Sequence, residues 1–119
     1  MTSTATFDLD ALHRGHAQHD AAILTSLYAE DAVLEIVNTT SPPSDPRRLV
    51  GVDAIRGYYE DVCSRDMTHE VEDAFSDGEH LAFRVACRYD TGERVLTSET
   101  CRLRDGRIAS ETLVKAWDG

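Results

Sequence analysis

Lysine is nearly absent from the sequence, since Lys115 is the only one among twelve basic residues. The other eleven are arginines, a bias that we attribute to genome composition. Acidic residues outnumber basic ones, and the formal net charge is −10. Nucleic acids and anionic membrane surfaces both attract basic proteins, so we expect neither of them as a partner.

Long apolar runs and cysteine-rich patterns are also missing. No apolar run approaches the roughly 20 residues that a membrane-spanning helix needs, and the first ten residues have no secretory-signal pattern. The three cysteines, at positions 63, 87 and 101, are odd in number and form no C-x-x-C motif. We therefore expect reduced thiols and a cytoplasmic protein. The sequence contains no P-loop, dinucleotide fingerprint, H-E-x-x-H or G-x-S-x-G motif, and we expect no cofactor and no metal.

The 119 residues are long enough for one domain with its own core, which we place at 1–119. In the first half, apolar residues recur at helical spacing in three segments. Aspartates at positions 8 or 10, 20 and 53 are candidate caps for these helices. We expect helices at 8–19, 21–29 and 54–65, a strand at 32–37, and a loop at 38–49 that holds all three prolines.

From Met67 onward the apolar pattern changes to a period of two, which is typical of strands. The dipeptide Asp-Gly at 77–78 and 105–106 favours tight hairpins, and Thr-Gly at 91–92 is a weaker signal of the same kind. We expect four strands, at 67–76, 79–90, 94–104 and 107–117. Helices followed by hairpins predict an α+β domain with helices packed on an antiparallel sheet.

The strand at 94–104 places a carboxylate on the face that turns inward. Val95, Cys101 and Leu103 mark that face, and Glu99 lies on it. Matching the apolar residues of the neighbouring strand requires three or five loop residues around positions 91–93. This pairing puts Glu99 opposite Val85. The next hairpin puts Glu99 near residue 112, and residue 117 then faces outward unless a bulge intervenes.

Several segments together resemble the nuclear-transport-factor-2-like superfamily, whose enzymes include SnoaL-like polyketide cyclases and ketosteroid isomerases. They are LYAEDAVLE, the Pro-Pro pair, LVGVDAIRGYYEDV, the LRDGRI hairpin and the terminal KAW. The resemblance implies a cone in which three N-terminal helices close a strongly curved, mainly antiparallel sheet around a pocket. It also implies a homodimer.

The steroid-isomerase pattern is only partly present. The resemblance places Ile36 where that family has its general-base aspartate, and Leu12 where it has its oxyanion tyrosine. Tyr28 and Tyr59 match the two supporting tyrosines, and Glu99 matches the protonated aspartate of the oxyanion site. The loop after the Pro-Pro pair is longer and adds Arg47 and Arg48.

Glu99 and His16 are the candidate catalytic residues. Apolar neighbours would raise the pKa of Glu99 and make it a neutral donor or a poised acid; the alternatives are an arginine-paired carboxylate or one that faces a dimer partner. His16 lies on the inward stripe of the first helix and is either a pocket base or a core residue. With His13 it could hold a metal, but no third ligand is evident.

The candidate substrate-binding residues are mostly aromatic, and plain core packing is their alternative role. Arg47 would clamp an anionic group at the pocket mouth or remain a solvated loop residue. The set comprises Tyr28, Tyr58, Tyr59, Phe83, Thr97, Trp117 and Arg47.

Two functions remain open from the sequence. One is a cofactor-independent isomerase, cyclase or hydratase that acts on a small hydrophobic carbonyl or epoxide compound. The other is a non-catalytic module that binds a small ligand or a protein partner as a dimer.

Overall fold

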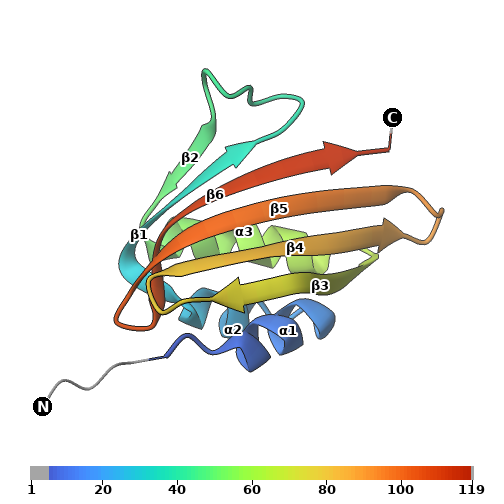
Figure 1. The fold of residues 1–119 in the computed structure, drawn as a ribbon. Helices are drawn as coiled ribbons and strands as arrows, with labels where there is room; N and C mark the ends of the chain where they lie inside the picture. Colours follow the sequence, from blue (N-terminus) through green and yellow to red (C-terminus); the bar gives the residue numbers. More distant parts are fainter. Residues whose placement is uncertain (1–5, 119) are drawn as a thin grey trace, which may run out of the picture.

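The chain folds into a curled sheet with helices against its concave side (Figure 1). The computed structural model describes residues 6–118; residue 119 and residues 1–5, where we expect no secretory signal, lie outside the described residues. The helices are α1 (Leu9–Ala17), α2 (Ala21–Ser26) and α3 (Val52–Ser64). The strands are β1 (Tyr28–Val37), β2 (Arg47–Val50), β3 (Met67–Ser76), β4 (His80–Tyr89), β5 (Arg94–Arg104) and β6 (Arg107–Trp117).

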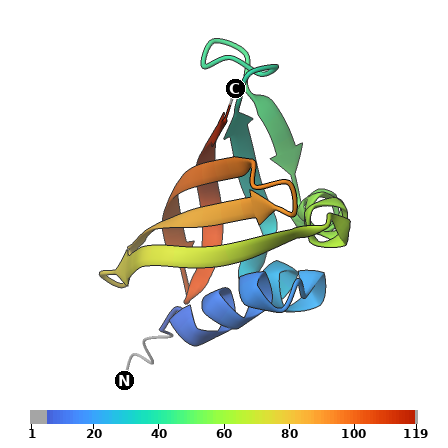
Figure 2. The same ribbon diagram turned by 90° about the vertical axis from the view of Figure 1, so that its right-hand side faces the viewer.

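The sheet has the strand order β2-β1-β6-β5-β4-β3. Every neighbouring pair is antiparallel except β1 and β6, which run parallel. Turned by 90°, the molecule shows the sheet bending round, with α1 and α2 below β3 and α3 beside the strands (Figure 2). The expected α+β cone is confirmed. No helix within residues 6–118 combines the length and apolar character needed to cross a membrane.

The four strands of the second half begin and end within one residue of the predicted positions. The Asp105-Gly106 turn has positive φ at both residues, at 54° and 75°, as a two-residue hairpin of type I′ requires. At the Thr-Gly turn, Gly92 has φ 92° and its N–H bonds to the carbonyl of Tyr89 at 2.9 Å. Glu93 still pairs with Tyr89, so the loop is the three residues 90–92.

The first half differs from the prediction at several boundaries. Asp8 and Asp20 cap α1 and α2, with 2.9 Å and 3.0 Å to the backbone N–H groups of Ala11 and Ile23. Asp53 is not the cap of α3, because that helix begins at Val52, two residues earlier than expected, and Gly51 is its N-cap. The second helix ends at residue 26 and not 29, because the following residues pair with β6 as the start of β1.

The expected loop at 38–49 ends too late, because its last three residues, 47–49, belong to a strand. Arg47 and Arg48 belong to β2, which pairs with Ile36 and Glu35 of β1 at the edge of the sheet. The three prolines all precede β2, so they leave its hydrogen-bond ladder intact. Arg47 is therefore an exposed strand residue and not a loop residue.

The expected register was wrong by two residues in one hairpin and by one in the other. Glu99 lies opposite Phe83 and not Val85, because the three-residue loop starts one position earlier than expected. On β6 the pairing shifts between Ile108 and Ser110, where Ala109 has no partner on β5. Because of this bulge, the side chains of β6 from residue 110 onward lie on the face opposite to the expected one, and Glu99 lies opposite Leu113.

Candidate functional site

A small cavity lies between the concave face of the sheet and the helices. Its wall is mostly apolar and is built from α1, α3 and the strands β3 to β6. About 30 Å³ is open to the centre of a water molecule, which is room for one or two waters and too little for an organic ligand. Trp117 lines one end and keeps 39% of its surface exposed, which places the cavity mouth there.

Glu99 is the carboxyl group of the cavity wall. The side chain is 2% exposed, on the inner face of β5 between Phe83 and Leu113. Thr97, two residues along the same face, donates a hydrogen bond from Oγ1 to Glu99 Oε2 at 3.0 Å. Burial, followed by the neighbouring Glu111, raises the pKa of Glu99 well above its usual value, which favours the protonated carboxyl group.

Glu111 stands behind Glu99, and it was not predicted as a site residue. It is buried on β6 opposite Cys101, and its carboxyl group lies near that of Glu99. Among the described residues, Glu99 Oε1 and Glu111 Oε2 have no hydrogen-bond partner. A proton held between these two oxygens gives each a partner, since two buried carboxylates side by side cannot both ionise.

Two tyrosines extend this pair into a hydrogen-bonded chain. Tyr28 donates its hydroxyl proton to Glu111 Oε1, and the hydroxyls of Tyr28 and Tyr59 lie 2.6 Å apart. Burial and the charge of Glu111 raise the pKa of both tyrosines, which therefore stay protonated. Tyr59 and Glu99 both line the cavity, so the two ends of the chain meet the same space.

His16 reaches the cavity from α1, as predicted, and is buried. Burial, followed by the nearby His69, lowers the pKa of His16 to about 3. The neutral ring leaves Nε2 without a hydrogen-bond partner among the described residues. His16 is thus placed to hydrogen-bond a ligand or water, but it holds a proton only weakly. His13 is exposed, against its expected inward position.

A cysteine and a histidine meet in the cavity wall near His16, although the sequence showed no such pair. Cys87 Sγ lies 3.3 Å from His69 Nδ1, and both residues line the cavity. Burial raises the pKa of Cys87 to about 11 and lowers that of His69 to about 4. The proton therefore stays on sulfur at neutral pH, which does not favour a thiolate nucleophile.

Lys115 is the second unpredicted polar residue of the wall. Its Nζ donates to the Tyr58 hydroxyl at 3.3 Å and lies 5.5 Å from the centre of that ring. Both Glu111 and Lys115 face inward because of the bulge at Ala109. One sequence feature pointed to them. A regular hairpin would turn Trp117 outward, and an inward tryptophan requires a bulge in this strand.

The structure brings six of the nine predicted site residues to the cavity wall. Phe83 and Tyr28 lie in the layer behind it, Phe83 beside His16 with ring centres 6.3 Å apart. Arg47 is exposed on β2 and does not line the cavity. The six predicted residues that do line the cavity are His16, Tyr58, Tyr59, Thr97, Glu99 and Trp117. Within residues 6–118, no three metal-binding side chains cluster.

Comparison with known proteins gives a family and several similar structures. The SnoaL-like domain matches residues 9–111, whereas no curated protein matches the chain. An NTF2-like protein of unknown function from Mesorhizobium loti is 24% identical over 93% of this chain and 88% of its own, with a TM-score of 0.74. IdmH from Streptomyces antibioticus, a candidate polyketide cyclase, is 24% identical over 90% and 88%, with a TM-score of 0.65.

A third similar structure is SalBIII, an epoxide hydrolase/cyclase-like enzyme with a role in pyran ring formation in the polyether salinomycin. It is 20% identical over 92% of this chain and 87% of its own, with a TM-score of 0.66. At these identities the similarity concerns the fold.

Proposed function

The chain belongs to the SnoaL-like domain family, and from that premise we propose that its cone binds a small hydrophobic carbonyl or epoxide compound on which Glu99 acts as an acid. The observation that carries this proposal is the buried carboxyl group of Glu99 at the cavity wall, whose pKa is raised by burial and by the neighbouring Glu111. A carboxylic acid held neutral at pH 7 can donate to an oxygen that gains negative charge. The chemistry of IdmH and SalBIII, as their descriptions give it, agrees with a cyclase or hydratase.

The reaction needs no cofactor. For an epoxide, Glu99 gives its proton to the ring oxygen while the carbon–oxygen bond breaks, and water attacks the carbon. The attacking water then returns a proton to Glu99, so the product is a diol and the enzyme is unchanged. His16 orients this water through a neutral ring nitrogen. While Glu99 lacks its proton, Thr97 donates a hydrogen bond to Glu99 and Tyr28 donates one to Glu111.

The size of the cavity sets a condition on binding. With about 30 Å³ of open space, a ligand must displace side chains at the mouth. Trp117 is exposed there, and it is the only tryptophan in the sequence. Ligand entry should therefore change the tryptophan fluorescence, which gives a binding signal that does not depend on turnover.

The test uses styrene oxide and cyclohex-3-enone as probes of an epoxide and an isomerisable ketone. We expect saturable quenching or shift of the Trp117 emission, and diol or conjugated ketone detected by chromatography. Glu99→Gln should keep the fluorescence change and lose product, whereas Glu70→Gln, on the exposed face of β3, should keep both. Product formation that survives in Glu99→Gln would rule out the assigned role of Glu99.

A non-catalytic binding module is the second candidate. It is favoured by the absence of the steroid-isomerase base and oxyanion tyrosine, since Ile36 and Leu12 are buried apolar residues at those positions. The module would bind a small hydrophobic molecule, or a protein partner, as a homodimer in the cytoplasm. Binding of the probes without any product, in wild type and variants alike, would support this candidate.

A further inference from the structure

The only lysine of the sequence lies in the wall of the cavity. Lys115 is on β6 opposite Thr97, and only the bulge at Ala109 brings it to the inner face. Most lysines extend their amine into water. Here Nζ lies against the Tyr58 ring, 5.5 Å from its centre, and donates to the Tyr58 hydroxyl at 3.3 Å.

Burial and two nearby arginines disfavour the protonated form of this amine. Within residues 6–118, no salt bridge joins Lys115 to a carboxylate. Burial, followed by the positive charge of Arg65 at the end of α3, lowers the pKa of Lys115. Arg47 on β2 adds to this effect, while Cys87 and Glu99 oppose it. The raised pKa of Glu99 weakens the counter-charge that it can supply to Lys115.

We propose that Lys115 is a nucleophilic amine that forms an imine with an aldehyde or ketone entering the cavity. A desolvated lysine near another cation is the arrangement that favours such chemistry. Apolar side chains of Val62, Val85 and Leu113 share the wall, so the site fits a small hydrophobic carbonyl compound.

The atoms of this step balance without an outside oxidant or reductant. Neutral Nζ attacks the carbonyl carbon, the carbonyl π pair moves to oxygen, and one amine proton passes to that oxygen. The carbinolamine then loses its hydroxyl as water, taking a proton from the acid of the cavity wall, Glu99, and leaves an iminium. Loss of the remaining proton gives the imine and restores the acid. The step goes beyond the acid role proposed above, since imine formation requires no turnover of an epoxide or alkene.

The test is reductive trapping with pentanal and sodium cyanoborohydride at pH 7. Trypsin cleaves after Arg107 and Lys115, so an alkylated Lys115 leaves one peptide from Ile108 to the C-terminus in place of two. Mass spectrometry of this peptide gives the labelling rate of Lys115 directly. The chain carries no other lysine, so the only other amine is its amino terminus.

The matched control is the double variant Lys115→Arg/Arg88→Lys. It moves the single lysine to an exposed position on the outer face of β4 and keeps the net charge. Nα-acetyllysine in the same solution is a second reference, and it serves even if the double variant does not fold. An ordinary lysine is neutral in only about 0.04% of molecules at pH 7, so it is labelled slowly.

We expect Lys115 to be labelled at least about tenfold faster than either reference, since each unit by which its pKa falls raises the neutral fraction about tenfold. Unfolding in urea should abolish the difference. A rate less than tenfold above both references overturns the proposal. That result would leave the acid role of Glu99 untouched, because the Glu99→Gln comparison measures diol or ketone and not amine labelling.

Discussion

Glu99 and Glu111 hold their carboxyl groups near each other inside the protein, although they are not paired across β5 and β6: Glu99 lies opposite Leu113, and Glu111 lies opposite Cys101. Glu99 faces inward by the regular alternation of β5, whereas Glu111 faces inward only because β6 bulges at Ala109. Thr97 donates to one carboxyl group and Tyr28 to the other. The pair is therefore held from both sides, and its protonation should be visible in the stability of the whole protein.

The first prediction concerns stability against pH. The pKa of Glu99 is raised on folding, so its proton stabilises the native state below about pH 4.5, and this contribution is lost as the pH rises towards the native pKa. Stability should fall by up to about 1.4 kcal/mol per pH unit in that window. Urea unfolding at pH 5, 6, 7 and 8 measures this slope.

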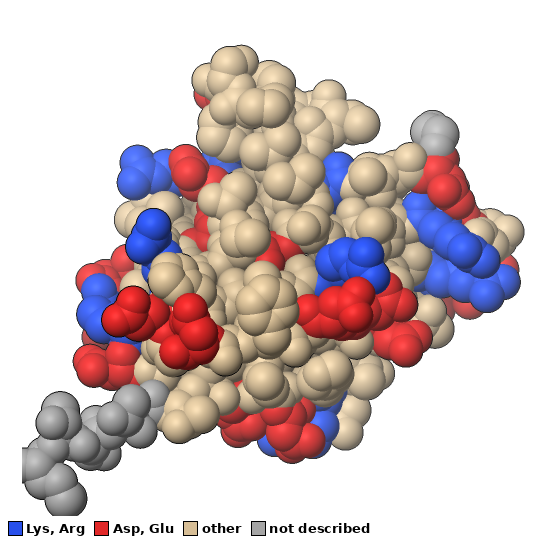
Figure 3. Space-filling view, in the orientation of Figure 1, with Lys and Arg blue, Asp and Glu red and all other residues tan. Residues whose placement is uncertain are grey.

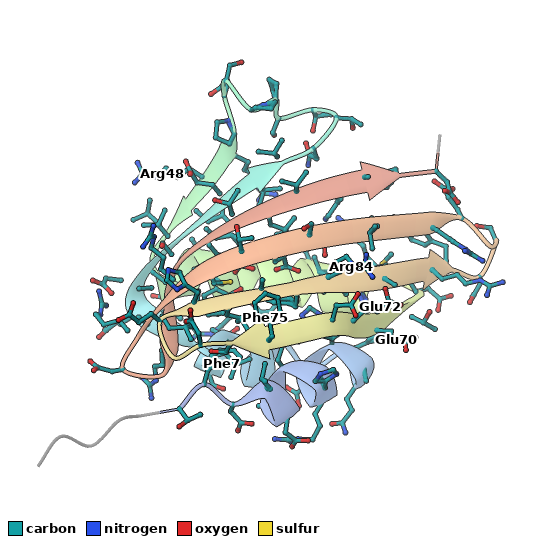
Figure 4. All side chains as sticks on the ribbon, viewed as in Figure 1. Phe7, Arg48, Glu70, Glu72, Phe75 and Arg84 are labelled. Carbon is teal, nitrogen blue, oxygen red and sulfur yellow. The ribbon has the colours of Figure 1, made fainter. Side chains whose placement is uncertain are left out.

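Glu99→Gln should lack this contribution, because the amide keeps the shape and a donor for Glu111 without titrating. Its stability relative to wild type should therefore rise steadily from pH 5 to pH 8. Glu70→Gln, on the exposed outer face of the sheet (Figure 4), is the matched control and should run parallel to wild type. A constant difference between wild type and Glu99→Gln would mean that Glu99 is ionised in the native state.

The second prediction concerns the tyrosine that supports the pair. Tyr28→Phe removes the donor to Glu111 and one partner of the Tyr59 hydroxyl. A buried group left without its partner costs about 1–3 kcal/mol, so urea unfolding at pH 7 should show a loss of this size. Tyr58→Phe is the control and should lose less, because its hydroxyl has only the 3.3 Å contact with Lys115. Equal losses would show that Glu111 does not depend on Tyr28.

The third prediction concerns the bulge. Deleting Ala109 would remove the residue that has no partner on β5, so Ser110 would follow Ile108 directly, and Glu111, Leu113 and Lys115 would keep their partners and their inward side. The melting temperature should therefore stay within ~10 °C of wild type. Ala109→Gly keeps the extra residue and is the control. A deletion variant that is far less stable than Ala109→Gly would mean that β6 needs the extra residue to fit between β1 and β5.

The fourth prediction concerns assembly. The outer face of the sheet shows charged groups around tan areas (Figure 3). Leu96 and Val114 lie there, 42% and 48% exposed, on the same face as Arg84, Ala86, Ser98 and Thr100. Burying such side chains in a two-fold interface would stabilise a homodimer. Light scattering at micromolar concentration should therefore give about twice the chain mass.

Leu96→Glu should convert this dimer to a monomer, because it would bury a charge at the interface. Glu60→Gln, at an exposed position of α3 away from the outer face of the sheet, is a control that should leave the mass unchanged. A wild-type mass of one chain would remove the outer face as an interface.

The second half of the fold followed from the sequence because its signals are local. The Asp-Gly turn at 105–106 fixes a two-residue hairpin, and the alternation of β5 fixes the inward side of Glu99. Both depend on residues that are neighbours in the chain. The burial of Glu99, and the position of Thr97 on the same face two residues before it, could therefore be predicted without a structure.

The first half was harder, because its boundaries depend on partners far along the chain. Tyr28 continues a helical pattern, yet it begins β1 by pairing with Ile108. Arg47 and Arg48 follow a proline-rich segment with no strand pattern, yet they pair with β1. Tertiary pairing overrides local preference at such positions.

The sequence alone determined the fold class, the hairpins and an inward Glu99, since periodicity and turn chemistry act between near neighbours. Only the tertiary structure decided what surrounds Glu99. One residue without a partner on β5, Ala109, turns Glu111 and Lys115 towards the cavity. Because side chains in a strand alternate between two faces, one extra residue moves every later side chain to the other face. The position of a bulge depends on how β6 fits between β1 and β5 in the curled sheet, and the local sequence does not encode that fit.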